Sequence, residues 1–129
     1  MIAVDSNILI RYLVQDHPAQ AALAARFLEE DLTPDCPGLV TIVALCETVW
    51  ALQRVYKIDL ATTRAIMKEL AAAPNLVVER EAVVAMALDA GPGFADVLLH
   101  AIGRQLGAEK TMTFDRKFAR LEGVELLGT

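Results

Sequence analysis

The chain has 129 residues, of which 55% are hydrophobic, and a net charge of −5. Its length is typical of one domain with a buried core, and we predict a single domain over residues 1–129. No apolar run reaches the ~18–20 uncharged residues that a membrane-spanning helix needs. Residues 1–5 include a carboxylate and no basic residue, which is unlike a secretory signal peptide. We therefore expect a cytoplasmic protein whose surplus hydrophobic residues form a core and a partner surface.

Short β-branched runs alternate with amphipathic stretches along the chain. Good N-cap residues precede three of the predicted helices, namely the cluster at 5–7, Thr41 and Asp59. Pro18 opens a further helix. In chain order, we predict a strand at residues 2–4, helices at 8–14 and 18–30, a strand at 39–40, helices at 42–56 and 60–73, a strand at 76–78, a helix at 79–89, a loop at 91–93, a helix at 94–106, and strands at 111–113 and 124–127.

This alternation predicts the α/β class, as an α/β/α sandwich with a central parallel sheet of four to five short strands flanked by helices. In such sheets, ligands bind beyond the carboxyl ends of the strands. Residues that follow a strand are therefore the first candidates for a functional site.

Four acidic residues stand out by this rule or by their surroundings. Asp5 follows the first strand, Asp115 stands two residues beyond the fourth, and Asp96 lies in the first turn of the helix after the loop at 91–93. Glu47 lies in a helix whose residues three and four positions away are all apolar or alanine, so no Lys or Arg of that helix can pair with it. We infer that Glu47 needs a tertiary partner, and a cation suits it.

Each acid also has a purely structural interpretation. Asp5 and Asp96 stand where a helix dipole favours negative charge, and Asp115 stands where a turn favours aspartate. Glu47 is the hardest of the four to explain in this way.

Four carboxylates at one sheet edge would repel one another without a counter-ion. Mg²⁺ and Mn²⁺ prefer oxygen ligands, and such ions activate water for attack on a phosphodiester. Zinc is disfavoured, because Cys36 and Cys46 have no ligand spacing and are expected to be reduced, partly buried thiols. Because four of the 17 acidic residues are assigned to this site, the net charge of −5 does not argue against a nucleic-acid substrate.

Four segments of the chain resemble the PIN-domain family of ribonucleases. Residues 1–9 (MIAVDSNIL) resemble its opening strand followed by Asp-Ser/Thr-Asn, and Glu47 in its apolar helix resembles its second acid. Residues 93–98 (GFADVL) resemble its Phe-Ala-Asp-Ala-Leu segment, and residues 111–115 (TMTFD) resemble its Thr-Phe-Asp ending. The resemblance covers nearly the whole chain, and the short single-domain form resembles the VapC toxins of toxin–antitoxin pairs.

The resemblance implies a PIN-like fold and a Mg²⁺-dependent endoribonuclease, with Mn²⁺ as an alternative ion, that acts on RNA such as tRNA. It also implies a homodimer and a cognate antitoxin protein that docks a C-terminal segment into the active-site groove. Gly93 stands where many relatives have a further acid, which leaves the number of metal ions open. The residues carried over are Asp5, Glu47, Asp96 and Asp115 as catalytic metal ligands, with Asn7 and Thr113 as supporting hydrogen-bonding residues.

Three basic residues beside Asp115 are candidates for contacts with RNA phosphates: Arg116, Lys117 and Arg120. Phosphate contacts supply most of the sequence-independent affinity for a nucleic acid. A solvated helical face explains the same three residues at least as well.

Two further residues share a helix face with Asp96. His100 lies four residues further along, where a lone histidine is more often structural than catalytic. Arg104 lies one more turn along and could pair with a carboxylate. Apolar helix faces are expected to form part of the dimer and antitoxin surfaces, although the sequence does not divide their residues between core and interface: Leu9, Leu13, Leu23, Phe27, Trp50 and Leu52.

The main alternative is a catalytically inactive binding module with the same fold, which the presence of all four acids disfavours. A metal-dependent phosphatase of the HAD type also has an Asp after its first strand, but it needs a second Asp where this chain has Asn7. A receiver domain needs an acid pair near the first strand and a phosphoacceptor Asp after a mid-chain strand, and neither is present.

Overall fold

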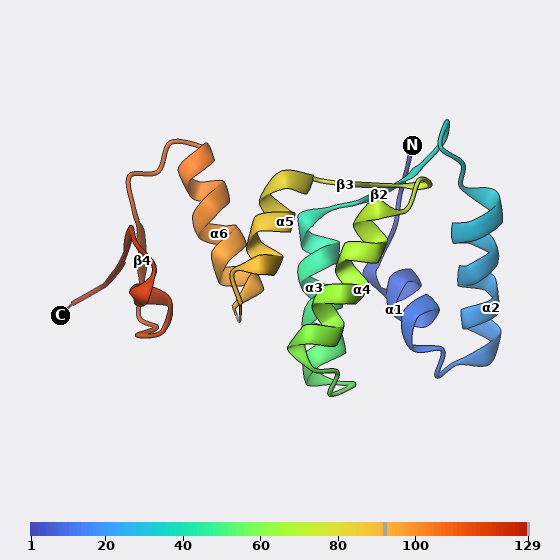
Figure 1. Ribbon diagram of the computed structural model, residues 1–129, viewed down its shortest axis with the longest axis horizontal. Coiled ribbons are helices and arrows are strands. Elements are labelled where there is room, and N and C mark those ends of the chain that lie inside the picture. The colour runs from blue at the N-terminus through green and yellow to red at the C-terminus, as the bar shows by residue number, and fades with distance from the viewer. Residues whose placement is uncertain (92, 129) are drawn as a thin grey trace. The chain divides into compact units, whose positions relative to one another are not determined.

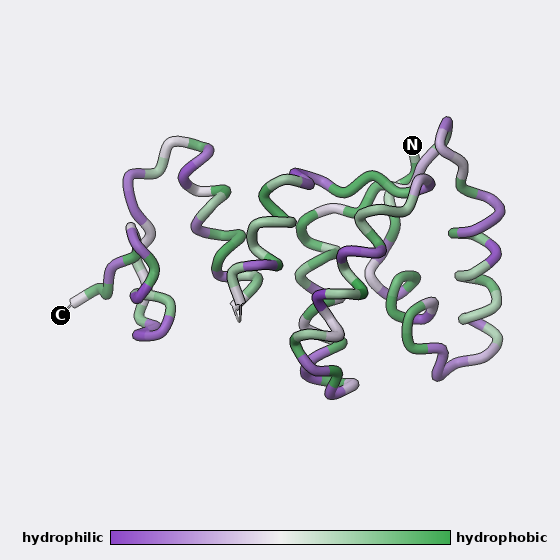
Figure 2. Tube along the Cα trace, viewed as in Figure 1, coloured by the Kyte–Doolittle hydropathy of each residue, from purple (hydrophilic) through white to green (hydrophobic). Residues whose placement is uncertain are grey.

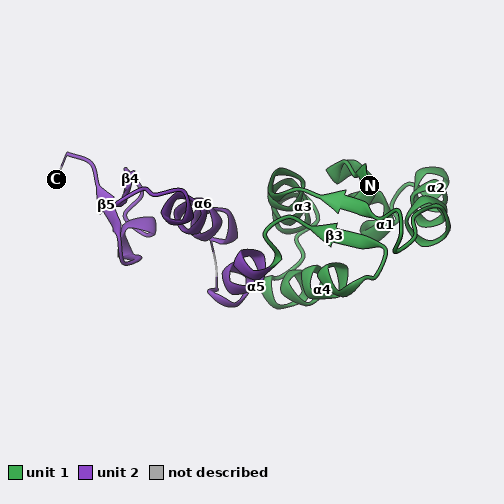
Figure 3. Ribbon diagram, turned by 90° about the horizontal axis from the view of Figure 1, so that it is seen from above, with its two compact units in different colours: residues 1–81 green, residues 82–129 purple. Residues whose placement is uncertain are grey.

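The computed structural model describes residues 1–91 and 93–128. The chain divides into two compact units, Met1–Glu81 (unit 1) and Ala82–Thr129 (unit 2), and each is described by itself (Figure 3). In chain order, the first elements are β1 (Ile2–Ala3), α1 (Ser6–Val14), α2 (Pro18–Arg26), the π-helical turn η1 (Phe27–Asp31), β2 (Gly38–Val40), α3 (Ile42–Arg54), α4 (Leu60–Ala72) and β3 (Leu76–Val78) (Figure 1). They are followed by α5 (Glu81–Asp89), α6 (Phe94–Gln105), β4 (Thr111–Thr113), the 3₁₀ turn η2 (Phe118–Arg120) and β5 (Val124–Leu126).

The strands pair in parallel, which confirms the predicted α/β class. In unit 1 they form a sheet in the order β1-β2-β3, with Ile2 opposite Gly38 and Gly38 opposite Leu76. In unit 2, β4 pairs with β5. Among the described residues the strands thus form a three-stranded sheet in unit 1 and a two-stranded sheet in unit 2. The pairing of β4 with β5 is extended by the Leu127 N–H, which donates to the Thr113 carbonyl at 2.9 Å.

Two predicted caps begin their helices as expected. The Thr41 Oγ1 accepts a hydrogen bond from the Ala44 amide at 3.2 Å, and the Asp59 Oδ1 accepts one from the Thr62 amide at 2.7 Å. Hydrogen bonding to Thr62 lowers the pKa of Asp59. The stabilisation by this cap is therefore present above the pKa of a free aspartate and is lost as the pH falls through the lowered pKa.

Most other boundaries agree with prediction to within a few residues, with two differences. The second predicted helix ends as the π-helical turn η1, and the sequence pattern does not predict the turn η2. Within the predicted loop at 91–93, Pro92 lies outside the described residues, while Gly91 and Gly93 have φ values of 93° and 86°. Among the described residues, none of the helices combines the length and apolar composition that crossing a membrane requires.

The core of unit 1 lies where the helices pack on the sheet and on one another. Strand β3 is hydrophobic along its length (Figure 2), and α1 packs against α3. Leu9 and Leu52 are 0% exposed and so belong to the core rather than to a partner surface, a division that the sequence left open. Leu13 and Phe27 are half-buried, whereas Leu23 and Trp50 are exposed. The largest fully buried apolar side chains of this unit are Leu9, Leu32, Val40, Leu45, Leu52 and Met67.

Gly38 allows the tight packing at the centre of this sheet. A Cβ atom at this position would lie 2.7 Å from the Leu32 Cδ1 and 2.8 Å from the Val4 Cγ2. Both are closer than carbon atoms normally approach, and both neighbours are buried, so they cannot easily move away.

We predict that Gly38→Ala lowers the free energy of unfolding by about 1–3 kcal/mol, because it overpacks the core. The matched control is Gly103→Ala in α6, where the new Cβ would make an ordinary 3.8 Å contact with Ala108. This control should raise stability by about 0.5–1 kcal/mol, because Ala is the better helix former. Urea denaturation measures both effects, and a Gly38→Ala protein as stable as the parent would refute the packing argument.

Candidate active site

Asp5 follows β1 and occupies the N-cap position of α1, with φ −72° and ψ 149°. Its carboxylate makes no capping hydrogen bond to the helix and is exposed. The Ser6 hydroxyl donates to its Oδ1 at 3.3 Å. The Asp5 carboxylate therefore does not cap α1. It stays available to a ligand near the positive end of the helix dipole.

Glu47 lies on the exposed face of α3, between Val43 and Trp50, which are 69% and 60% exposed. These two apolar neighbours face outward with Glu47, so its carboxylate is not buried among them. The tertiary partner of Glu47 stays a prediction. The buried face of α3 is formed instead by residues such as Leu45, Thr48 and Leu52.

Glu79 is an acid at a strand end that the sequence pattern did not single out. It follows β3, and its Oε1 accepts a hydrogen bond from the Ile42 amide at 2.8 Å, at the first residue of α3. Glu79 and Thr41 thus both cap this helix, from two neighbouring strands of the sheet. The rule about residues that follow strands could have found Glu79, but the apolar periodicity places this residue in the next helix.

Unit 2 brings two of the predicted acids into one hollow of about 360 Å³. Asp96 and Asp115 both line it, together with Lys117 and Arg120. Apolar residues complete the lining: Ala90, Val97, Phe118 and Leu121, with Gly93 beside them.

Asp96 lies half-buried in the first turn of α6. Gly93 precedes this helix with a φ of 86°, a backbone conformation that residues with a Cβ rarely adopt. A Cβ atom at Gly93 would lie 4.0 Å from the Asp96 Oδ2. The backbone at position 93 thus favours glycine over an acidic residue. Because Gly93 has no side chain, the space beside Asp96 stays open.

Asp115 is held by a hydrogen-bonded turn. Its Oδ1 accepts from the amides of Lys117 at 2.8 Å and Phe118 at 3.2 Å. The Thr113 Oγ1 in turn accepts from the Asp115 amide at 3.0 Å. The turn fixes the Oδ1 atom of Asp115. No hydrogen bond to Oδ2 is found among the described residues, so Oδ2 can bind a ligand.

The basic residues of unit 2 differ in what they contact. Lys110 forms an ion pair with Glu125 at 3.1 Å. Arg104 donates to the Glu109 carbonyl rather than pairing with a carboxylate, because its side chain closes the turn that follows α6. Within the described part of the chain, no ion pair involves Lys117 or Arg120. These two cations therefore line the hollow with their charges available to an anion, whereas Arg116 does not line it.

His100 connects three segments of unit 2. Its Nδ1 lies 2.8 Å from the Thr111 Oγ1, and its Nε2 lies 3.0 Å from the Glu122 carbonyl oxygen. A carbonyl only accepts, which assigns the proton to Nε2 and makes the Thr111 hydroxyl the donor to Nδ1 in the neutral ring. A Cβ atom at Gly123 would lie 3.0 Å from the His100 Cε1, so glycine makes room for the ring. These contacts support a structural rather than a catalytic role for His100.

We predict that His100→Ala destabilises the protein by about 1–3 kcal/mol, because its polar partners lose their hydrogen bonds. Urea denaturation checks this, with Leu106→Ala, a change at a 74% exposed side chain, as the control that should shift stability by less than about 0.5 kcal/mol. Any activity of the folded variant should keep the parent's pH profile. A fully stable variant with an altered pH profile would instead make His100 a catalytic residue.

The donor set of unit 2 fits a hard divalent cation. Among the described residues, no group of three or more His, Cys, Asp or Glu residues could hold a metal ion. Mg²⁺, however, binds through one or two carboxylates and retains several waters, and Asp96 and Asp115 supply two carboxylates in one hollow.

The two cysteines were expected to be reduced, partly buried thiols. Burial raises the pKa of Cys46, which keeps that thiol protonated at neutral pH. Cys36 is exposed rather than partly buried.

A family model, the PIN domain, matches residues 2–124, and the chain belongs to this family. The match extends over both units and identifies the family, but it does not identify a subfamily. No curated protein matches the sequence. PIN domains are generally nucleases, which are hydrolases, and they typically use divalent metal ions.

Proposed function

We propose that this protein is a metal-dependent endoribonuclease that hydrolyses RNA phosphodiester bonds, with Mg²⁺ as its ion and Mn²⁺ as a substitute. The observation that carries the proposal is the hollow in which Asp96 and Asp115 lie beside two cations that have no ion pair among the described residues. A nuclease needs carboxylates for the metal and cations for the substrate phosphate. This hollow, in a chain of a nuclease family, contains both.

Asp96 and Asp115 are the proposed metal ligands of unit 2, and Asp5 and Glu47 are those of unit 1. The bound ion would supply an activated water and stabilise negative charge on the phosphate. Thr113 orients Asp115 through its backbone amide, and Ser6 donates to Asp5.

Lys117 and Arg120 are the proposed contacts to phosphate oxygens. A guanidinium can hold two of these oxygens at once, whereas an ammonium acts as a point charge. Arg116, the third sequence candidate, lies outside the hollow and is assigned no role in it.

We propose further that the enzyme is the VapC-type toxin of a type II toxin–antitoxin pair, that it acts in the cytoplasm as a homodimer, and that a cognate antitoxin inhibits it. Resemblance of the sequence motifs supports this assignment. A structured RNA such as tRNA is the proposed substrate.

The alternative is a catalytically inactive binding module with the same fold. Such a module would bind its partner without any metal-dependent cleavage of RNA.

We predict that Asp5→Asn and Asp96→Asn each reduce cleavage of RNA by about 100-fold or more, because each removes a metal ligand, and losing even an outer-shell partner costs about 10–100-fold. Folding should be retained or improved, since each change removes a carboxylate from an acidic site. The matched control is Asp35→Asn, at an exposed acid of the loop before β2, which should cut like the parent. Gel analysis of end-labelled RNA with Mg²⁺, Mn²⁺ or EDTA measures the rates.

EDTA should stop cleavage by the parent, and excess Mg²⁺ should restore it. Equal cleavage by the parent and both Asn variants would place the active site elsewhere. A parent that cuts no RNA with either ion would favour the binding module.

We also predict that Lys117→Ala and Arg120→Ala weaken RNA binding and make it less sensitive to salt. Each lost phosphate contact should lower the slope of log affinity against log salt by about 0.7 for a single strand. Arg116→Ala removes the same charge outside the hollow and is the matched control. Filter binding over a series of salt concentrations measures the slopes, and identical slopes for the three variants would remove the hollow from phosphate binding.

A further inference from the structure

A second hollow lies in unit 1, between α1 and the segment formed by α2 and η1. Its volume is about 530 Å³, within the range of small-ligand pockets. Three polar side chains line it, Asn7, Arg11 and Gln20, and its apolar walls include Ile8, Leu23 and Phe27. Apolar walls with a few polar groups are the composition of a site for a small, partly polar molecule.

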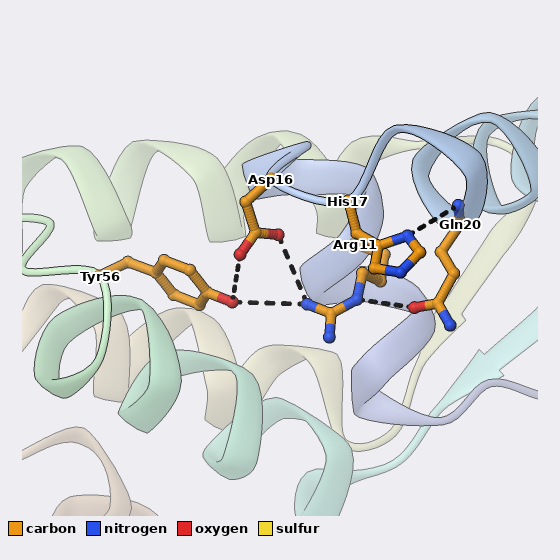
Figure 4. A network of polar contacts seen from close by, with 5 residues as sticks. All are labelled: Arg11, Asp16, His17, Gln20 and Tyr56. Atoms are coloured by element: carbon orange, nitrogen blue, oxygen red, sulfur yellow. Dashed lines mark hydrogen bonds and ion pairs between the residues drawn. The ribbon is translucent and has the colours of Figure 1, made fainter.

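Arg11 has polar contacts with three side chains at this hollow, as Figure 4 shows. Its Nε donates to the Gln20 Oε1 at 2.8 Å, and its Nη1 lies 3.4 Å from both the Asp16 Oδ1 and the Tyr56 hydroxyl. The Tyr56 hydroxyl also donates to the Asp16 Oδ2 at 3.1 Å. These bonds use Nε and Nη1, and Nη2 stays available as a donor among the described residues.

The other two polar groups add further donors. An arginine only donates, so the Gln20 oxygen must face Arg11, and the Gln20 amide nitrogen is left as a donor. The Asn7 side chain has no hydrogen bond among the described residues, and its amide offers two donors and an acceptor. Donors thus outnumber acceptors in the hollow, which suits a ligand whose edge carries acceptors.

The charge of this hollow disfavours a phosphate as its occupant. Asp16 lies 3.4 Å from the Arg11 guanidinium and offsets its positive charge. A neutral ligand with an acceptor edge therefore fits better than an anion. Guanine fits this description, because its O6 and N7 both accept hydrogen bonds, and an arginine contacts this pair more often than any other base edge.

The hollow also has a suitable place in the chain. Asn7 and Ile8 belong to the first turns of α1, and Asn7 comes two residues after Asp5. A base held there would belong to a nucleotide close to the proposed metal ligand Asp5. Single-stranded RNA is read in this way, with unstacked bases held against side chains and hydrogen-bonded at their edges.

We propose that the hollow between α1 and α2 is a nucleobase subsite that takes a guanine of single-stranded RNA and so selects the position of the cut. The proposal rests on the proposed function in that it takes RNA as the substrate. It assigns Arg11 and Gln20 to base recognition and Leu23 to the apolar wall.

The first experiment changes the wall of the hollow. Leu23 is 68% exposed, so Leu23→Glu places a carboxylate in the hollow without burying it. Ala22→Glu adds the same charge to the neighbouring residue of α2, at an exposed position outside the hollow, and is the matched control. Fluorescence anisotropy in EDTA and low salt measures binding of uridine pentanucleotides with a central G, A, C or U.

The parent and Ala22→Glu should bind the central-G oligonucleotide about fivefold or more tightly than the central-U one. Leu23→Glu should lose this preference. Equal binding of all four oligonucleotides by the parent, or an unchanged preference in Leu23→Glu, would overturn the proposal. A preference lost equally in both variants would also overturn it, since it would reflect added charge alone.

The second experiment tests the donor argument with a nearly isosteric change. Gln20→Glu keeps an oxygen for Arg11 and replaces the remaining amide donor by an acceptor. The preference should move from guanine toward cytosine, whose N4 amino group donates, by about fivefold or more. An unchanged base preference would show that Gln20 does not contact the base.

Cleavage assays separate this proposal from the proposed function. A parent that cuts RNA at the same positions and rates as Leu23→Glu keeps the ribonuclease and removes the base subsite. A parent that cuts no RNA, but binds with a guanine preference that only Leu23→Glu and Gln20→Glu alter, keeps the subsite and removes the ribonuclease.

Discussion

The parallel pairing of the strands is the constraint on which the rest of the structure depends. Parallel neighbours end at the same edge of a sheet, so the residues just beyond one strand lie near those just beyond its neighbour. In unit 1 the residues that come after the three strands include Asp5, Thr41 and Glu79. Each is polar, and each stands at or against the beginning of a helix, where amides without helical partners favour oxygen atoms.

These polar residues divide between two tasks. Thr41 and Glu79 use their oxygens on the first amides of α3, and in doing so they fix that helix on the sheet. Asp5 stands in the equivalent place before α1 and makes no such bond. A carboxylate that the fold positions but does not use is the kind of group that a bound cation or substrate employs, and the same contrast separates the two oxygens of Asp115.

Local signals in the sequence predicted most of the elements, because the interactions that set them are local. The caps at Thr41 and Asp59 act within three residues of themselves, and the sequence shows both partners at once. The roles of Glu79 and His100 depend on partners 37 and 22 residues away, which no local pattern contains. For the same reason, the exposure of Glu47 could not be read from its apolar neighbours, since a helix can turn an apolar face outward.

The proposed roles of the two hollows depend on different interactions. An RNA backbone approaching a protein of net charge −5 is repelled unless local positive charge offsets the acids. Lys117 and Arg120 supply part of that charge beside Asp96 and Asp115, and a divalent ion would supply the rest. The hollow of unit 1 is nearly neutral, because Asp16 offsets Arg11, so it adds little to the attraction for phosphate and leaves discrimination to hydrogen bonds and shape. Attraction for the backbone and selection of a base would therefore respond to different changes: salt and metal ions would control the first, and single side-chain amides the second.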